Sequence, residues 1–174
     1  MTEYALRPAR SDELSQLVAI DDDASELYKS AGFAFDFAPD HPFVLAEKLR
    51  WGRAIELGLA YVATDQKDLP IGFVTLSYVD GDPYLDQIAV QTKHMRRGVG
   101  TLLLNHATSW SNGRPLWLTT YAHIPWNKPY YERHGFITVP EEKYGPELRA
   151  IIHEQRSALP DPHQRITMIH LEGF

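Results

Sequence analysis

The sequence has no cysteine among its 174 residues. Such a chain has no disulfide, no thiolate nucleophile and no cysteine-ligated metal centre, which favours a reducing compartment. Long apolar stretches are also missing, because the run from Leu57 to Ala63 is far shorter than the roughly 20 residues of a bilayer span. Glu3 and Arg7 stand where a secretory signal would begin its apolar core. We therefore expect a cytoplasmic protein with no membrane partner and no export signal.

Clusters of positive charge are absent as well. The 17 Lys and Arg residues are spread along a chain whose formal net charge is −6. Binding of duplex nucleic acid needs a clustered cationic face, so we expect no nucleic-acid partner. The eight histidines show no His-Glu-x-x-His or similar ligand spacing, so we expect no metal site. An acidic protein of this kind is better suited to a cationic ligand.

What the sequence does contain is an alternation of strand and helix patterns. With no repeat, low-complexity tract or linker, we expect a single domain over residues 1–174. Strands are predicted at residues 4–8, 57–64, 71–79, 84–90, 115–121, from 136 to 139 and 165–171. Helices are predicted after a cap at Ser11, over about 43–55, from 98 to Gly113, up to about 134, and over about 146–157. In the second helix Leu45, Leu49 and Trp51 are expected to point inward.

The most informative stretch joins the strand at 84–90 to the helix that begins near Gly98. A strand that ends in a glycine-containing loop at a helix N-terminus presents free backbone N–H groups and suits an anion. Gly98 and Gly100 allow those amides to approach the anion closely. The loop lacks the Gly-Lys-Ser/Thr ending of a nucleoside triphosphate site, and Leu103 replaces the third glycine of a dinucleotide fingerprint. The alternative is an ordinary turn into a core helix.

This stretch resembles the signature Gln/Arg-x-x-Gly-x-Gly/Ala of the GNAT superfamily of acyl-CoA N-acyltransferases. Gly98 and Gly100 match its glycines, while Met95 stands at the Gln/Arg position. The resemblance implies that the loop binds the pyrophosphate of coenzyme A and that strand backbone pairs with the pantetheine arm. The residues implied for coenzyme binding are Ile88, Ala89, Val90, Arg96, Arg97, Gly98, Val99, Gly100 and Thr101.

A second segment, residues 125–136, is similar to the fourth helix of the same family, which often ends Tyr-Glu-x-x-Gly-Phe. Tyr131 lies at the matching tyrosine, four residues before Gly135. The resemblance implies that Tyr131 protonates the leaving thiolate. Many members carry an asparagine seven residues before the tyrosine, whereas Ile124 stands there and Asn127 is closer. Asn127 is assigned to coenzyme binding on the pattern of a subgroup with Pro-Trp-Asn ahead of this helix.

The resemblance implies an α/β (α+β) fold of the GNAT type. Its central sheet is mixed and mostly antiparallel, has about seven strands, is splayed between strands 4 and 5, and is flanked by helices. The implied co-substrate is acetyl-CoA. For the predicted helix at 146–157 we consider two roles, a homodimer contact and a lid.

Acyl transfer to an amine also needs a base. Strand alternation places Asp86 on one face with Tyr84 and Ile88, and Asp86 is our candidate base, the alternative being a surface or capping carboxylate. His123 is a second candidate base, against a plain loop histidine. The predicted acceptor pocket includes Asp21, Asp22, Asp23, Phe33, Phe35 and Phe37, for which the alternative is a solvated helix end and core packing.

Taken with these residues, the resemblance implies an N-acetyltransferase that moves an acetyl group from acetyl-CoA directly to a primary amine of a small molecule or peptide. Direct attack is favoured because the chain has no cysteine and no Gly-x-Ser-x-Gly elbow. The alternative function is a non-catalytic acyl-CoA-binding or sensing module of the same fold.

Overall fold

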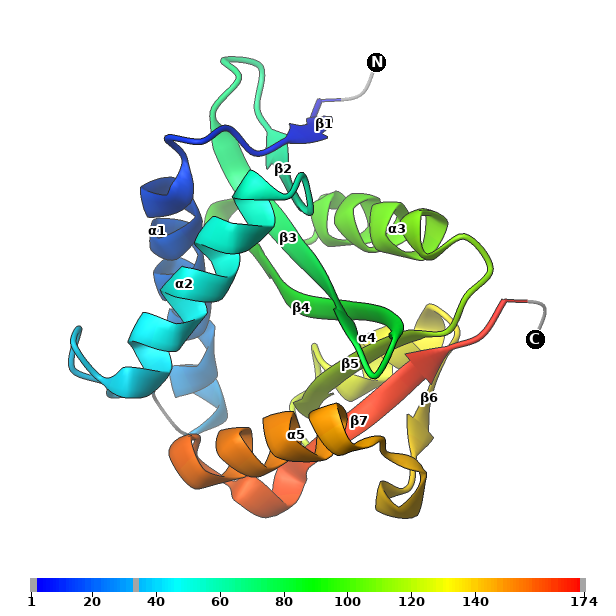
Figure 1. Cartoon of the computed structure of the whole chain (residues 1–174). Coiled ribbons are helices and arrows are strands. Elements are labelled where there is room, and N and C mark those ends of the chain that lie inside the picture. Colours follow the sequence, from blue (N-terminus) through cyan, green and yellow to red (C-terminus); the bar gives the residue numbers. More distant parts are fainter. Residues whose placement is uncertain (1–2, 33–34, 173–174) are drawn as a thin grey trace. The chain divides into compact units, whose positions relative to one another are not determined.

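The computed structural model of the chain describes residues 3–32 and 35–172. These residues form a seven-stranded sheet in the order β1-β2-β3-β4-β5-β7-β6 (Figure 1). The strands are β1 (Ala5–Pro8), β2 (Ala60–Thr64), β3 (Pro70–Val79), β4 (Asp82–Val90), β5 (Leu116–Tyr121), β6 (Phe136–Val139) and β7 (Arg165–His170). The helices are α1 (Leu14–Ser25), α2 (Pro42–Glu56), α3 (Val99–Ser111), α4 (Lys128–Arg133) and α5 (Pro146–Ala158). Short 3₁₀ turns are η1 (Glu26–Ala31), η2 (Thr92–His94), η3 (Glu141–Lys143) and η4 (Pro162–Gln164).

The chain divides into two compact units. The N-terminal unit comprises the residues up to Ser77 together with Asp86–Ala107, and the C-terminal unit comprises Tyr78–Leu85 together with the residues from Thr108 onward. Strand β4 contributes to both, because its first half belongs to the C-terminal unit and its second half to the N-terminal unit.

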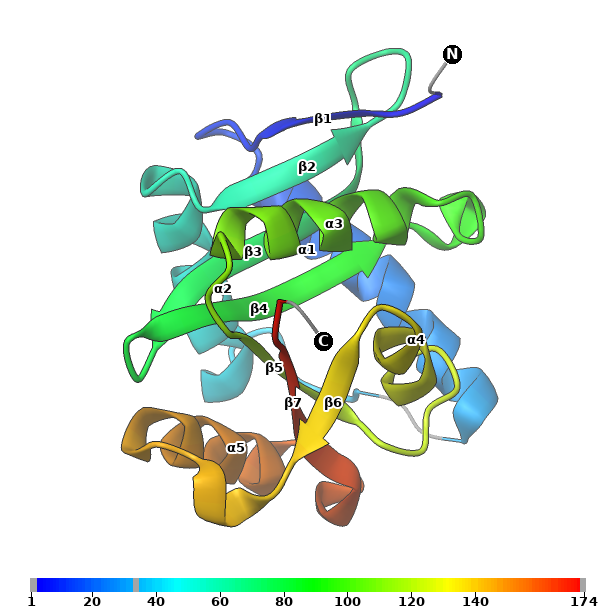
Figure 2. The same cartoon turned by 90° about the vertical axis from the view of Figure 1, so that its right-hand side faces the viewer.

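In the N-terminal unit, helices cover both faces of the strands, with α3 on one face and α1 and α2 on the other (Figure 2). Strand β2 pairs antiparallel with β1 and with β3. The core under α1 and α2 contains Leu17, Ile20, Trp51, Val62, Phe73 and Ala89. The rings of Trp51 and Phe73 have centroids 5.3 Å apart. This core fixes α1 and α2 against the second half of β4.

In the C-terminal unit, β7 pairs antiparallel with β5 and β6. Strand β5 runs parallel to β4, with Trp117 opposite Tyr84. Helix α5 packs through a buried cluster made of Val79, Tyr84, Val139, Tyr144, Leu148, Ile152 and Ile169. The helix predicted at 146–157 is therefore part of the core of this unit.

The predicted fold class is confirmed, because the sheet is mixed and mostly antiparallel and is flanked by helices. The predicted order of strands and helices is also confirmed, with bounds that shift by a few residues. The prediction of one domain over 1–174 stays a prediction.

One helix start was predicted wrongly. Helix α1 begins at Leu14, without a side-chain cap from Ser11. Glu13 precedes the helix, and its carboxylate accepts hydrogen bonds from Arg10 N at 2.7 Å and from Arg7 Nη1 at 2.8 Å. The bond from Arg7 lowers the pKa of Glu13. The N-terminus of α1 is therefore accompanied by contacts of Glu13 with Arg7 and Arg10 in place of a Ser11 cap.

The inward face of α2 was also predicted only in part. Trp51 is buried as expected, whereas Leu45 is 46% exposed and Leu49 is 76% exposed. Residues 47, 51 and 54 lie at helical spacing on one face, and positions 45 and 49 fall outside it. The half-buried Glu47 therefore shares the inward face of α2 with the buried Trp51.

Candidate functional site

The loop between β4 and α3 (residues 91–98) has the backbone geometry of an anion site. Arg96 has φ 62° and Gly98 has φ 84°, so two residues close together adopt the left-handed conformation. A side chain is rarely found in this conformation, and such loops turn successive N–H groups toward one point. The loop leads into α3, whose first-turn amides have no acceptor inside the helix. A loop of this kind at a helix N-terminus is able to bind an anion, and a Cβ atom added at Gly98 would meet only open space.

The strand residues predicted to pair with the pantetheine arm, Ile88, Ala89 and Val90, differ in how far they are buried. Ala89 is 8% exposed and Val90 is 9% exposed, while Ile88 is half-buried. Ala89 lies in the core with Leu17 and Ile20. Because the side chains of Ala89 and Val90 are buried, only the main chain is left for the predicted pairing.

The three aspartates near the end of α1 differ from one another. The Asp21 carboxylate accepts a 2.5 Å hydrogen bond from Gln87 Nε2, and burial raises the pKa of Asp21 to about 6. Asp23 Oδ2 accepts a 2.7 Å hydrogen bond from the backbone N–H of Thr92. Asp22 is exposed. Of the three aspartates predicted for the acceptor pocket, Asp21 and Asp23 thus form hydrogen bonds within the N-terminal unit.

Asp86, the predicted base, is paired with a cation. Its Oδ2 lies 3.1 Å from Arg50 Nε on α2. On the same helix, Glu47 is close enough for its charge to interact with those of Asp21 and Asp86. Burial first, and then these neighbouring charges, raise the pKa of Glu47 to about 8. The structure therefore places carboxyl groups from α1, α2 and β4 together on this part of the N-terminal unit.

Sequence reasoning missed both Glu47 and Arg50. A usable signal existed for Glu47, because it lies one helical turn before Trp51, which was expected to point inward. No local pattern marked Arg50, since its partner Asp86 is 36 positions away in sequence.

The C-terminal unit holds the other predicted catalytic residue. Tyr131 lies on α4, is 8% exposed, and packs edge-on against Phe136 with ring centroids 5.6 Å apart. Asn127 directly precedes α4, and its carbonyl accepts the Tyr131 N–H at 3.0 Å. The family-like segment thus forms the expected short helix, and the assigned roles of Tyr131 and Asn127 stay predictions.

His123 has an orienting partner in the same unit. Its Nε2 lies 3.0 Å from Asp161 Oδ2, and its ring meets Tyr121 edge-on at 5.6 Å. A histidine held by a carboxylate is a common acid–base arrangement. This contact is exposed, so it also fits a surface ion pair.

The predicted aromatic wall is partly described. Phe33 lies outside the described residues. Phe35 meets Tyr28 edge-on at 4.9 Å, and Phe37 stacks on Phe43 at 5.4 Å. These half-buried rings pack against residues of η1 and α2, and their contact with an acceptor stays a prediction.

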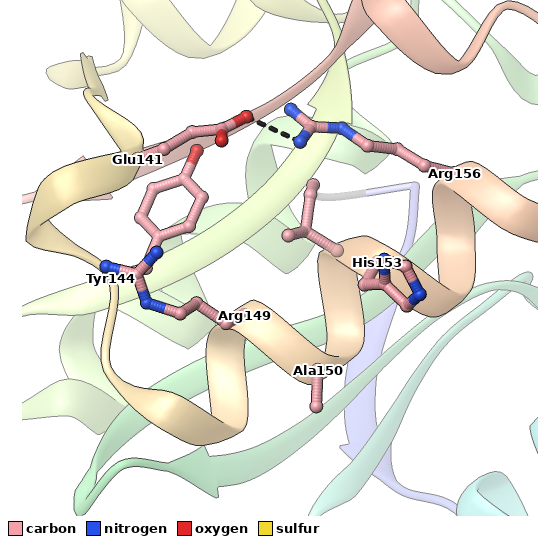
Figure 3. A pocket seen from close by; sticks show the side chains of 7 residues that line it. Glu141, Tyr144, Arg149, Ala150, His153 and Arg156 are labelled. Atoms are coloured by element: carbon pink, nitrogen blue, oxygen red, sulfur yellow. Dashed lines mark ion pairs between the residues drawn. The ribbon is translucent and has the colours of Figure 1, made fainter.

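A pocket of about 420 Å³ lies beside α5 (Figure 3). It is lined by Glu141, Tyr144, Arg149, Ala150, Ile152, His153 and Arg156. Two of these lining residues, Glu141 and Arg156, form an ion pair with 2.5 Å between Oε1 and Nη1. None of the residues predicted for the site lines this pocket.

Residues 3–32 and 35–172 contain no group of three or more His, Cys, Asp or Glu side chains arranged to hold a metal ion. In that same part of the chain, every helix is too short or too polar to span a bilayer.

Comparison with known proteins bears on the loop and on the fold. Residues 56–138 match the acetyltransferase (GNAT) domain family. The chain superposes on the PaiA N-acetyltransferase of Thermoplasma acidophilum, solved with coenzyme A, at a TM-score of 0.69 and 13% identity, covering 98% of this chain and 99% of that one. A GNAT-family acetyltransferase of Bacillus cereus matches at 0.65 and 17% identity, with 98% of each chain covered.

A third structure is N-acetylglutamate synthase of Neisseria gonorrhoeae, solved with coenzyme A and N-acetyl-glutamate. It matches at a TM-score of 0.66 and 15% identity, covering 98% of this chain and 35% of that one. At these identities the structural likeness establishes the fold. The chain therefore has the GNAT fold, and its residues 56–138 match the GNAT acetyltransferase domain family.

Proposed function

We propose that this protein transfers an acetyl group from acetyl-CoA directly to a primary amine of a small molecule or peptide. The observation that carries the proposal is the β4–α3 loop, where left-handed Arg96 and Gly98 precede the N-terminus of α3 inside the matched domain. Coenzyme A in two structures of the same fold supports it. The absence of cysteine favours direct attack over a cysteine-linked acyl intermediate and keeps the cytoplasm as the expected compartment.

In this proposal the coenzyme supplies an acetyl group activated as a thioester. Backbone amides of residues 96–101 hold the pyrophosphate, and the main chain of 88–90 aligns the pantetheine arm. The amine nitrogen attacks the thioester carbonyl carbon, the carbon–sulfur bond breaks, and the Tyr131 hydroxyl gives its proton to the departing sulfur.

The amine must lose a proton to a base, and two carboxyl groups, those of Asp86 and Glu47, are candidates for this base. Asp86 is our predicted base, but its carboxylate forms an ion pair with Arg50. Glu47 has a pKa of about 8, which is close to the operating pH that favours proton transfer. We therefore add Glu47 to Asp86 and His123 as a candidate base.

The test measures release of coenzyme A thiol from acetyl-CoA with a panel of primary amines. For Tyr131→Phe we expect turnover to fall about 10²–10⁴-fold, the range for a positioned proton donor, with coenzyme affinity almost unchanged. Tyr130→Phe is the matched control, because Tyr130 is adjacent to Tyr131, is half-buried and carries the same hydroxyl. Wild-type turnover in Tyr131→Phe would contradict the assignment. Coenzyme binding without turnover on any amine would favour the sensing module.

A further inference from the structure

The Asp23–Thr92 contact joins α1 to the β4–α3 loop across 69 positions of sequence. Thr92 begins the 3₁₀ turn η2, and the first N–H groups of such a turn have no acceptor within it. Asp23 supplies that acceptor, with Oδ2 2.7 Å from the Thr92 nitrogen. Its Oδ1 lies 3.4 Å from the Thr92 hydroxyl oxygen. The carboxylate thus acts as a cap provided by a distant helix.

The helix that carries Asp23 is itself fixed to the strand before the loop. Leu17 and Ile20 are almost fully buried in the core that contains Ala89 of β4. Asp21 accepts a hydrogen bond from Gln87, also on β4. Asp23 is therefore presented to the loop by a rigid element, which is what precise positioning needs.

The helix dipole of α1 makes the negative charge of Asp23 unfavourable unless its carboxylate is hydrogen-bonded to Thr92. Asp21, Asp22 and Asp23 lie near the C-terminal end of α1, where the helix dipole disfavours negative charge, and the last turn has no basic residue. A hydrogen bond from a backbone N–H to a carboxylate is among the stronger ones in proteins. Both Asp22 and Asp23 are exposed to solvent, and the bond to Thr92 further offsets the cost for Asp23.

We propose that Asp23 is a positioning residue of the coenzyme site: by holding the Thr92 N–H it keeps the loop 91–98 in the conformation that presents its amides to a pyrophosphate. This inference rests on the proposed function. A second contact supports the same loop, because the Tyr4 hydroxyl lies 2.8 Å from His94 Nδ1. Asp23 acts through Thr92, and the proposal gives it no contact with the coenzyme.

Whether the loss of Asp23 weakens or strengthens coenzyme binding distinguishes a positioning role from a purely electrostatic one. A carboxylate near a pyrophosphate repels it, so deleting the charge alone would tighten coenzyme binding. Loss of positioning would weaken it. Asp22→Ala removes the same charge one residue away without removing the bond to Thr92, and it is the matched control.

The experiment measures the Kd of coenzyme A by calorimetry, together with the KM for acetyl-CoA and kcat. For Asp23→Ala we expect Kd and KM to rise about tenfold, the cost of a lost charged hydrogen bond, with kcat within about twofold of wild type. Asp23→Asn keeps an oxygen acceptor for Thr92, so its Kd should return to within about threefold of wild type. Asp22→Ala should bind coenzyme A as the wild type does, or slightly more tightly.

Amide hydrogen exchange of the unliganded protein gives an independent readout. Exchange of the Thr92 amide should be faster in Asp23→Ala and unchanged in Asp22→Ala. If the wild type binds coenzyme A and Asp23→Ala binds it equally well, the positioning role is wrong. A fall in kcat with unchanged KM would also overturn it. If the wild type itself binds no coenzyme A, the proposed function fails, and hydrogen exchange still shows whether Asp23 holds the loop.

Discussion

Asp86 and Glu47 are two carboxyl groups of the N-terminal unit in different electrostatic situations. Asp86 has Arg50 as a counter-ion, with 3.1 Å between Oδ2 and Nε. Glu47 lies on the buried side of α2, and its environment raises its pKa to about 8. A carboxyl group held in this way gains a proton on folding at neutral pH, so Glu47 makes the stability of the protein depend on pH.

We predict that Glu47→Gln stabilises the fold above about pH 4.5. The unfolded chain releases this proton near pH 4.5 and the folded protein near pH 8, so folding takes up a proton between those values. Wild-type stability therefore declines as pH rises through this window. The glutamine variant has no such decline from this position and should gain about 1–3 kcal/mol at pH 8 and almost nothing at pH 4.

Urea unfolding at several pH values measures this difference. Glu56→Gln is the control, since Glu56 is an exposed residue at the end of the same helix. A stability difference between Glu47→Gln and wild type that stays constant from pH 4 to pH 8 would contradict the raised pKa.

Some candidate site residues could be located in the fold from local spacing alone. Gly98, Gly100 and Tyr131 stand in short motifs, and the structure places them in the expected loop and helices. The partners Arg50 and Thr92 could not be predicted, because each meets its carboxylate across a long sequence separation. Such pairs depend on how helices dock onto strands, which periodicity does not specify.

At the scale of elements, α5 is held by a cap that comes from a different part of the chain. Asp80, in the turn between β3 and β4, accepts hydrogen bonds from Glu147 N at 2.9 Å and from Leu148 N at 3.0 Å. In return, Asp80 N donates to Glu147 Oε1 at 2.8 Å. This reciprocal arrangement is a capping box formed between distant segments. The sequence predicted helix 146–157 and gave no sign of its cap.

We predict that this cap makes Gly145 intolerant of a side chain. A Cβ atom at Gly145 would collide with the Asp80 carboxylate. Asp80→Ala should cost about 1–2 kcal/mol of stability as a lost helix cap, and Gly145→Ala should cost a similar amount through the collision. In the double variant Asp80→Ala/Gly145→Ala no carboxylate is left for the Cβ atom to collide with. Gly145→Ala should therefore cost much less stability when it is added to Asp80→Ala than when it is made in the wild type.

A double-mutant cycle measured by chemical denaturation tests this coupling. Additive losses in the double variant would show that Asp80 and Gly145 act independently. A control with Asp82→Ala removes a different carboxylate at the same turn, one that lies 3.1 Å from Trp117 Nε1, and it should leave the cost of Gly145→Ala unchanged.

At the scale of the whole molecule, the fold was predictable because element order and periodicity both pointed to it. The helical spacing from Val99 to Trp110 and the polar turn at Asp80–Gly81 are encoded locally, and they reappear as α3 and as the turn between β3 and β4. The inward face of α2 was less predictable, since Leu45 and Leu49 are apolar yet exposed. Apolar residues on a surface are common, so hydrophobicity alone cannot select the buried stripe of a helix.

Coenzyme binding at the start of α3 is tested by Gly100→Glu, at a position where the backbone does not require glycine. Gly100 lies in the first turn of α3, outside the set of residues with positive φ. A glutamate there suits the helix dipole and leaves the fold intact, while it places bulk and negative charge at the proposed pyrophosphate site. Gly100→Ala is the control for size without charge.

The decisive measurement is a calorimetric titration of the wild type and both variants with coenzyme A, after circular dichroism has shown that all three are folded. We expect binding by the wild type, weaker binding by Gly100→Ala, and a loss of at least about 100-fold in affinity for Gly100→Glu. Equal affinity of the wild type and Gly100→Glu for coenzyme A, or no binding by the wild type, would contradict this expectation.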